Sequence, residues 1–212
     1  MNPRLVVAMT GATGAVYGVR LLEALHDTPV ETHVVVSEWA RKTIAIETDR
    51  RPDDVLALAT RVYREGNQAA AISSGSFRTM GMVVAPCSMK TLAGIAYGFA
   101  DNLIVRAAEV TMKESRKLML LVRESPLSVI HLENMLTVAR AGAVIAPPAP
   151  AFYANPASVE EMVDQTVGRV LDQFDIEHSL LHRWGERRGD DASEEDTGLV
   201  DGRRRAYVQA DR

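Results

Sequence analysis

Short apolar runs alternate along this chain with longer segments in which apolar residues recur every three or four positions. The short runs are rich in β-branched residues and predict buried strands at 5–8, 32–36, 81–85, 117–122 and 143–146. The periodic segments predict helices after the first strand and at about 37–47, 88–96, 102–114, 128–141 and 158–174, with another that opens at Pro52 and includes Val62. Residues 66–80 show neither pattern and are expected to be irregular.

The alternation of strands and helices predicts a single α/β domain with a doubly wound, Rossmann-like or flavodoxin-like parallel sheet. Local signals support these elements. Ser88 is a candidate N-cap, and Ser158 with Glu161 is a candidate capping box. Pro86 and Pro147 are expected to end the strands that precede them.

The first strand leads directly into a glycine turn at residues 9–18, MTGATGAVYG. Gly11 and Gly14 permit a sharp turn and a close approach of a ligand to the backbone. The unpaired amides at the start of the next helix suit a phosphate or another electron-rich group. The spacing GxxGxxxG differs from the dinucleotide fingerprint GxGxxG. The turn alone is therefore equally compatible with a nucleotide site and with a merely tight turn.

The composition changes this picture little. The chain has 212 residues, 47% of them hydrophobic and 25% charged, as in ordinary globular proteins. The net charge of −4 and the lack of a basic stripe argue against nucleic acid as a partner. A single cysteine, Cys87, fits a reducing compartment. No apolar stretch reaches the roughly 20 residues of a membrane span, and no signal peptide is recognised. We expect a cytoplasmic protein.

Two regions follow from the same composition. Residues 1–186 carry the strand and helix pattern and are expected to form the domain. Residues 187–212 carry charges of both signs and almost no apolar periodicity. We expect a charged, disordered tail there, with a partner-binding segment as the alternative.

Ligands of open α/β sheets lie beyond the carboxyl ends of the strands. In this chain those ends bring hydroxyl groups and new helix starts, above all at Ser88 and Thr91. This combination favours a phosphate-bearing cofactor; the alternative is that Ser88 only caps its helix and Thr91 packs. Arg123 and Glu124 follow a strand and can bind an anion and move a proton, although an exposed ion pair is the commoner explanation.

Other candidate residues are neutral on pattern alone. Tyr153 is on a proline-rich loop, Arg169 falls on the polar side of the last helix, and Glu47 and Lys113 have no distinctive context. The motifs HExxH, paired CxxC and G-x-S-x-G are absent from the sequence. We therefore expect no metal and no serine esterase chemistry. The residues alone indicate a flavin- or nucleotide-type α/β enzyme.

Collinear motifs extend this interpretation. They are MTGATGAVYGVRLL (9–22), AIETD (45–49), APCSMKTL (85–92), NLIVRAA (102–108), VRESPLSVIHLENML (122–136), PAFY (150–153) and RWGE (183–186). In these segments, and over about residues 3–186, the chain resembles the UbiX-type flavin prenyltransferases. Members of that family bind FMN and add a dimethylallyl group from dimethylallyl phosphate to N5 and C6 of the reduced flavin.

The resemblance assigns roles to residues of this chain. It places FMN on Gly11, Ala12, Thr13, Ser37, Ser88, Met89, Lys90, Thr91 and Arg123. It places the prenyl phosphate on Tyr153 and Arg169, with Lys113 and Arg123 nearby. Glu47 and Glu124 become the carboxylates of the transfer site, and Thr13 is included among the catalytic candidates.

The resemblance also implies partners. The prenylated FMN would pass to a UbiD-type decarboxylase, and the chain would form a homo-oligomer, a dodecamer in typical members, with sites between subunits. Trp184 is a candidate interface residue, with core packing as the alternative. Position 13 is often Ser in the family and is Thr here, so prenylation efficiency or donor choice is expected to differ.

Two alternatives stay open at this point. A flavin-dependent cysteine decarboxylase of related fold would require a catalytic His early in the chain, where this sequence has Tyr17. A non-catalytic flavin carrier that serves a decarboxylase would have no need of Glu47, Lys113, Glu124, Tyr153 and Arg169 together.

Overall fold

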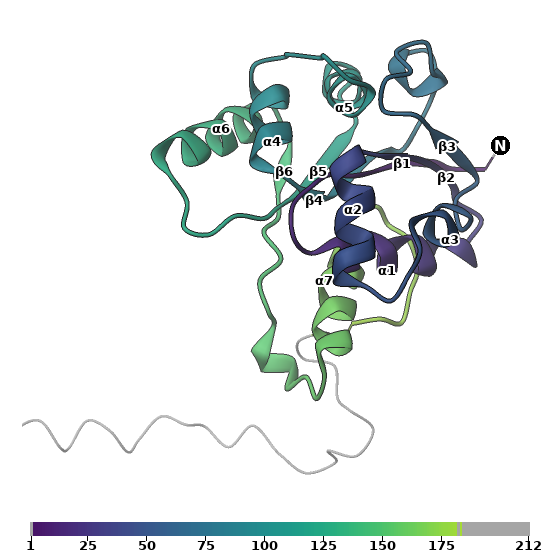
Figure 1. The fold of residues 1–212 in the computed structure, drawn as a ribbon, viewed down its shortest axis with the longest axis vertical. Helices are drawn as coiled ribbons and strands as arrows, with labels where there is room; N and C mark the ends of the chain where they lie inside the picture. The colour runs from purple at the N-terminus through teal and green to yellow at the C-terminus, as the bar shows by residue number, and fades with distance from the viewer. Residues whose placement is uncertain (1, 182, 184–212) are drawn as a thin grey trace, which may run out of the picture. The chain divides into compact units, whose positions relative to one another are not determined.

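The structure, a computed structural model, describes residues 2–181 and residue 183. Within these residues the strands form one six-stranded sheet whose paired neighbours are all parallel (Figure 1). The strands are β1 Arg4–Met9, β2 Glu31–Val36, β3 Arg61–Tyr63, β4 Gly81–Cys87, β5 Lys117–Val122 and β6 Val144–Ile145. Their spatial order is β3-β2-β1-β4-β5-β6, which confirms the predicted doubly wound fold.

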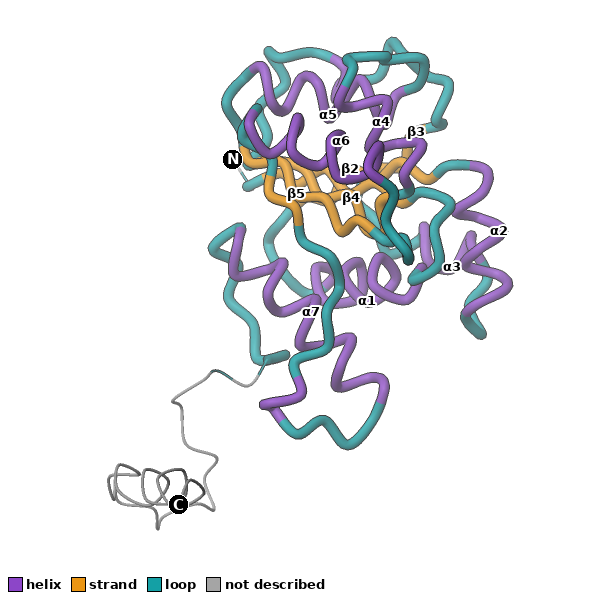
Figure 2. The backbone as a smooth tube through the Cα atoms, turned by 90° about the vertical axis from the view of Figure 1, so that its left-hand side faces the viewer, coloured by secondary structure: helices purple, strands orange, loops and turns teal. Residues whose placement is uncertain are grey.

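Helices cover both faces of the sheet. They are α1 Ala15–His26, α2 Glu38–Glu47, α3 Pro52–Leu56, α4 Met89–Ala96, α5 Leu103–Lys113, α6 Val129–Arg140 and α7 Val159–Gln173. Short 3-10 turns lie at η1 Ala71–Ser73 and η2 Phe152–Ala154. Figure 2 shows α1 and α7 on one side of the sheet and α4, α5 and α6 on the other.

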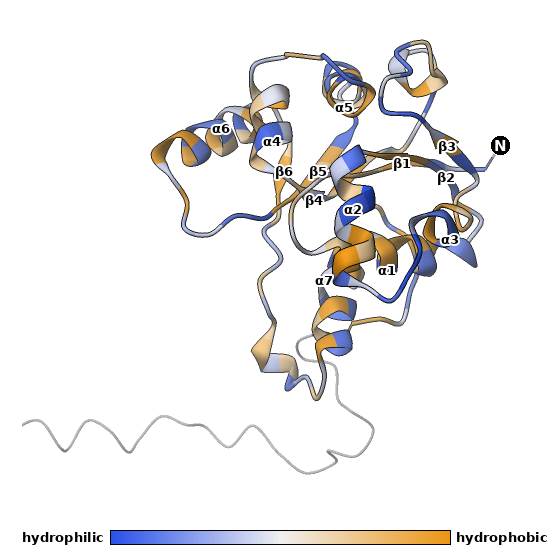
Figure 3. Cartoon of the chain, in the orientation of Figure 1, coloured by the Kyte–Doolittle hydropathy of each residue, from blue (hydrophilic) through white to orange (hydrophobic). Residues whose placement is uncertain are grey.

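The strands alternate their side chains between two apolar cores. Along β1, Leu5, Val7 and Met9 belong to the core under α1 and α7, while Val6 and Ala8 belong to the core under α4 and α5. Both faces of the strand are therefore buried. This explains why the sequence of β1 is a continuous apolar run and does not alternate between apolar and polar residues. Figure 3 shows the apolar character of the central strands.

Two predicted boundaries are wrong. The helix that opens at Pro52 ends at Leu56, and Val62 belongs to the edge strand β3. Thr60 and Thr32 fix this strand beside β2, because each backbone N–H donates to the other residue's hydroxyl oxygen. The second error is at Pro86, which does not end β4. The strand continues to Cys87 after a shift in its register with β5.

Two glycines, Gly14 and Gly18, shape the connection between β1 and α1 and the packing of α1. Gly14 has φ 98°, which L side chains rarely adopt, so a residue with a Cβ would be strained there. Gly18 lies where α1 crosses the sheet, and a Cβ at this position would be 2.3 Å from the carbonyl oxygen of Ala85. Gly14 therefore permits a backbone conformation that other residues rarely adopt, and Gly18 permits the close approach of α1 to the sheet.

The predicted tail at 187–212, the boundary at 186 and Trp184 lie outside the described residues. Within the described part of the chain, every helix is too short or too polar to cross a membrane.

Candidate functional site

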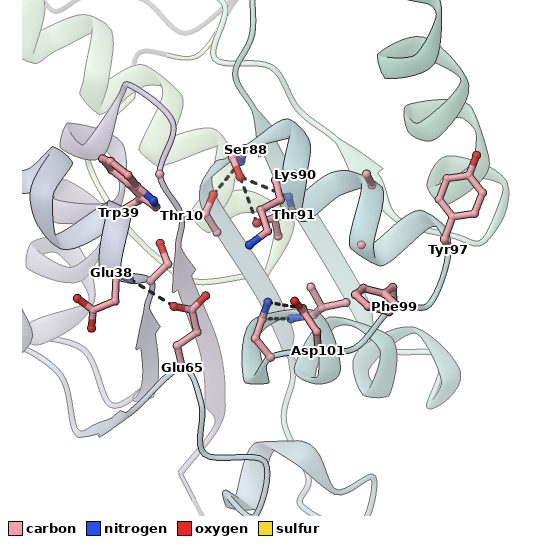
Figure 4. Close-up of a pocket in the computed structure, with 16 residues that line it drawn as sticks. Thr10, Glu38, Trp39, Glu65, Ser88, Lys90, Thr91, Tyr97, Phe99 and Asp101 are labelled. Carbon is pink, nitrogen blue, oxygen red and sulfur yellow. Dashed lines mark hydrogen bonds between the residues drawn. The ribbon is translucent and has the colours of Figure 1, made fainter.

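Helix starts gather around a cavity of about 490 Å³ at the carboxyl edge of the sheet (Figure 4). Ser37, Ser88 and Asn102 line it and are the N-caps of α2, α4 and α5. Each side chain accepts a hydrogen bond from the backbone N–H three residues later. The positive ends of the helix dipoles therefore lie at the same cavity, which favours a bound anion.

Thr10 joins the two strand exits that form the floor of the cavity. Its hydroxyl donates to the carbonyl of Pro86 at 2.8 Å and accepts the N–H of Ser88 at 2.7 Å. The Thr10 side chain is almost fully buried. This pair of bonds fixes the start of α4 relative to the glycine turn, so the two predicted cofactor-binding segments have a defined separation.

Backbone donors remain available at the cavity. Within the described residues, the N–H groups of Met89 and Lys90 at the start of α4 have no hydrogen-bond acceptor, and neither does that of Trp39 in α2. Lys90 adds an exposed ammonium group at the same end of the cavity. Unpaired amides and a lysine fit the phosphate of a flavin mononucleotide, because phosphates bind at helix N-termini.

Most residues predicted to bind the cofactor meet at this cavity. Gly11, Ser37, Ser88, Lys90 and Thr91 line it. Met89 contributes its backbone at the start of α4, and Ala12 and Thr13 continue the glycine turn from Gly11. Arg123 follows β5, the strand next to β4, and its backbone N–H donates to the carbonyl of Cys87.

The backbone N–H groups at the start of α1 already bind a carboxylate of the protein itself. One carboxylate oxygen of Glu47 accepts the N–H groups of Gly14 and Ala15 at 2.8 and 2.9 Å. The amides that the sequence suggests for a phosphate at this turn are therefore already paired. Glu47 is thereby held beside the glycine turn, and its second carboxylate oxygen accepts no hydrogen bond within the described residues.

A second group of predicted residues lies near α7. Burial raises the pKa of the Tyr17 phenol, and the positive charge of Arg123 and the nearby Thr166 side chain act in the opposite direction. Thr166 and Arg169 line a cavity of about 110 Å³ together with Gln165. Gln165 is buried, and its side-chain oxygen has no hydrogen-bond partner within the described residues. Tyr17 therefore links the Arg123 region to the helix that carries Arg169.

The predicted chemical groups are open to solvent in the single chain. Arg169 is exposed and pairs with Asp172 at 3.3 Å. Tyr153 lies exposed in η2, and Glu124 is exposed with its carboxylate on the N–H of Ser125. Glu124 follows β5, Tyr153 follows β6, and Arg169 lines a cavity with Ala146 and Ala151, so all three groups lie on the carboxyl side of the sheet and are open to solvent.

Within one chain, Lys113 does not lie on this carboxyl side of the sheet. It is the last residue of α5, whose first turn lines the cavity and whose end lies near Lys117 at the start of β5. Its ammonium group pairs with Glu114. Lys113 therefore lies toward the opposite edge of the sheet from the other predicted residues.

Sequence reasoning missed Thr10, Trp39, Glu65 and Asn102, all of which line the cavity at the starts of α2, α4 and α5. Thr10 and Asn102 had a usable signal, since each is a polar residue at a strand exit or helix start. Cys87 lies next to the cavity, but burial raises the pKa of its thiol to about 12, so it is not a nucleophile.

Comparisons with known proteins agree with this geometry. The family model described as Flavoprotein matches residues 1–180. A probable UbiX-like flavin prenyltransferase from Escherichia coli O157:H7 is 58% identical over 182 residues, covering 85% of this chain and 92% of its own. The crystal structure of AnUbiX in complex with FMN and dimethylallyl pyrophosphate has 55% identity and a TM-score of 0.87, covering 89% of this chain and 100% of its own.

A third relative is informative about assembly. The crystal structure of a dodecameric FMN-dependent UbiX-like decarboxylase from Escherichia coli O157:H7 is 57% identical with a TM-score of 0.85. The match covers 86% of this chain and 100% of that one.

Proposed function

The chain belongs to the Flavoprotein family, among its UbiX-like flavin prenyltransferases, and we propose that it prenylates reduced FMN at N5 and C6 with dimethylallyl phosphate as donor. The observation that carries this proposal is the cavity at the starts of α2, α4 and α5, whose unpaired amides fit a phosphate. FMN supplies the electron-rich ring that accepts the allyl group. Everything else is done by side chains that bind, orient and exchange protons.

The phosphate of FMN would lie between the starts of α2 and α4, where Ser88, Thr91 and Lys90 line the cavity. The flavin ring would then extend toward Gly11, Ala12 and Thr13. Arg123 follows the neighbouring strand β5 and supplies a positive charge to the same edge. Glu47, which the start of α1 holds beside the glycine turn, would then be a carboxylate available to the bound flavin.

The leaving phosphate requires positive charge, because the C1′–oxygen bond breaks with both electrons on the phosphate. Arg169 and the Tyr153 hydroxyl would bind that phosphate, with Arg123 nearby through Tyr17 and Thr166. Bond formation at N5 would release the N5 proton, whereas ring closure would add one proton to C2′ of the allyl group and remove one from C6. Glu124 and Glu47 are the carboxylates available to accept protons at this edge.

Exposure of these groups supports a homo-oligomer, because an allyl cation must be shielded from water. A second copy would cover the site and could bring its own Lys113 to the donor phosphate. Apolar side chains of α6, including Val129, Ile130 and Leu136, are exposed in the single chain and suit such contacts. We infer a dodecamer, as in the E. coli relative.

The recipient of the product would be a UbiD-type decarboxylase that uses prenylated FMN. A cytoplasmic location is consistent with the substrate, because reduced flavin and the single free cysteine, Cys87, both suit a reducing compartment. The flavin carrier remains the second candidate. The shared positions of Glu47, Arg123 and Glu124 at one sheet edge favour catalysis over a carrier.

The test is anaerobic incubation of the purified protein with reduced FMN and dimethylallyl phosphate, followed by mass spectrometry of the released flavin. We expect the flavin mass to increase by one dimethylallyl unit, and we expect no increase when the FMN is left oxidised. Bound but unmodified FMN in the reduced sample would support the carrier. Sedimentation of the same sample should give a multiple of the chain mass.

A further inference from the structure

A second groove adjoins the flavin cavity and has no part in the proposed function. Its volume is about 820 Å³, and it lies beyond the carboxyl ends of β2 and β3. Arg41, Tyr63 and Arg64 are among the residues that line it. Glu38, Glu65 and Asn102 line both this groove and the flavin cavity, so these residues form the boundary between them.

Glu65 spans this boundary with two hydrogen bonds. Its carbonyl oxygen accepts the N–H of Leu103, the first residue of α5, at 2.8 Å. Its carboxylate accepts the N–H of Glu38, the first residue of α2, at 3.3 Å. Figure 4 shows the Glu65 side chain reaching from its loop toward α2. A negative charge is thus fixed where the two spaces meet.

The charge of Glu65 affects which flavin the site can bind, because FMN and FAD differ beyond their first phosphate. In FMN the phosphate is the end of the molecule, whereas in FAD it continues into a second phosphate and an adenosine. Doubly wound folds bind dinucleotides across the crevice outside the strand ends. For FAD seated with its flavin in the cavity, the adjoining groove beyond β2 and β3 is the space for the second nucleotide.

That groove is otherwise suited to such a group. Arg64 brings positive charge, Arg41 brings a guanidinium group that pairs with Asp53 at 3.2 Å, and Tyr63 brings an aromatic ring; these features accommodate a phosphate and a base. A dinucleotide that extends from the flavin cavity into this groove passes Glu65. The Glu65 carboxylate repels a second phosphate, and it already accepts the N–H of Glu38 that could otherwise bind this phosphate. We infer that Glu65 is a specificity-determining residue that makes the site select FMN over FAD. The inference rests on the proposed function, since it takes the flavin to lie in the cavity.

The experiment compares the Kd values of FMN and FAD for the parent protein and two Glu65 variants by titration of flavin fluorescence. The parent should bind FMN more tightly. Glu65→Ala removes both the charge and the bulk, and should raise the affinity for FAD relative to FMN about tenfold. Glu65→Gln keeps the size but removes the charge, and should shift the ratio in the same direction by about threefold.

Asp101→Asn is the matched control. Asp101 lines only the flavin cavity, and the Asn variant keeps an acceptor for the amide of Asn102. It should leave the FAD-to-FMN ratio within about twofold of the parent. The inference is overturned if both Glu65 variants keep the parent ratio, or if Asp101→Asn shifts it as much as Glu65→Gln does. A parent protein that binds neither flavin would instead overturn the proposed function.

Discussion

At the scale of single residues, the structure distinguishes side chains that the sequence treats alike. Glu47 and Glu124 are both predicted as carboxylates of the transfer site, yet only Glu47 is tied to the glycine turn by two backbone N–H groups. Glu124 bonds only the adjacent N–H of Ser125. A motif gives the residue type at a position, but these partners depend on how α2 returns to the start of α1. The sequence alone could not supply them.

Arg169 gives the residue-scale prediction. Its guanidinium is exposed and pairs with Asp172, so it contributes little to folding. A charge-assisted hydrogen bond to the donor phosphate contributes about 1.5–3 kcal/mol. Arg169→Ala should therefore lower the prenylation efficiency at sub-saturating donor about 10- to 150-fold, measured as flavin product formed under anaerobic conditions.

The FMN affinity and the melting temperature of Arg169→Ala should match those of the parent, which separates a donor-binding role from a structural one. Arg169→Lys should recover part of the loss, since a lysine keeps the charge without the two-pronged geometry. Undiminished prenylation by Arg169→Ala would mean that the donor phosphate binds elsewhere.

At the scale of elements, the sequence predicts those that bury apolar side chains on a regular period and misses those that do not. The central strands β1, β2, β4 and β5 are predicted because both of their faces are buried. The edge strand β3 exposes Arg61 and Val62, so it carries no such signal. Its place depends on the Thr32–Thr60 bonds with β2, which join residues far apart in the chain.

Gly18 gives the element-scale prediction. A Cβ at this position would meet the Ala85 carbonyl oxygen at 2.3 Å and the Met9 side chain at 2.6 Å. Gly18→Ala should force α1 away from the sheet and lower the free energy of unfolding by about 1–3 kcal/mol. The measurement is the melting temperature, which should fall by about 2–4 °C for each kcal/mol.

Gly66→Ala is the matched control, because nothing lies within 4 Å of the Cβ that it would add. It should leave the melting temperature unchanged or slightly raised. Equal melting temperatures for the two variants would show that α1 does not need its close contact with β4.

At the scale of the whole molecule, the sequence pattern predicts the doubly wound sheet and the helix starts at its carboxyl edge, but it predicts neither the spatial order of the strands nor the full lining of the cavity. Ser37 and Ser88 follow strands and could be placed at the carboxyl edge in advance. Glu65 comes from an irregular segment whose position is set by its hydrogen bonds to Glu38 and Leu103. Its place in the cavity wall nearest the second groove could therefore not be predicted from the sequence.

The stability of the whole molecule should depend on pH through His33. The residue is 5% exposed, its Nδ1 bonds the Tyr63 hydroxyl at 2.9 Å, and its Nε2 has no hydrogen-bond partner within the described residues. Burial lowers the pKa of His33, and the positive charges of Arg4 and Arg61 act in the same direction, whereas Glu31 opposes them. The unfolded chain therefore takes up a proton at a higher pH than the folded protein does.

Stability is consequently lost as the pH falls below the ordinary histidine pKa of about 6.5 toward the lowered folded pKa of His33. The denaturant midpoint of the parent should decrease between about pH 7.5 and pH 5.5, and the decrease should be smaller in His33→Asn, whose amide can still bond Tyr63. His26→Asn, at an exposed position on α1, should keep the parent's pH dependence. If His33→Asn loses stability over this range as steeply as the parent, then the pKa of His33 does not differ between the folded and unfolded states, and the pH dependence has another source.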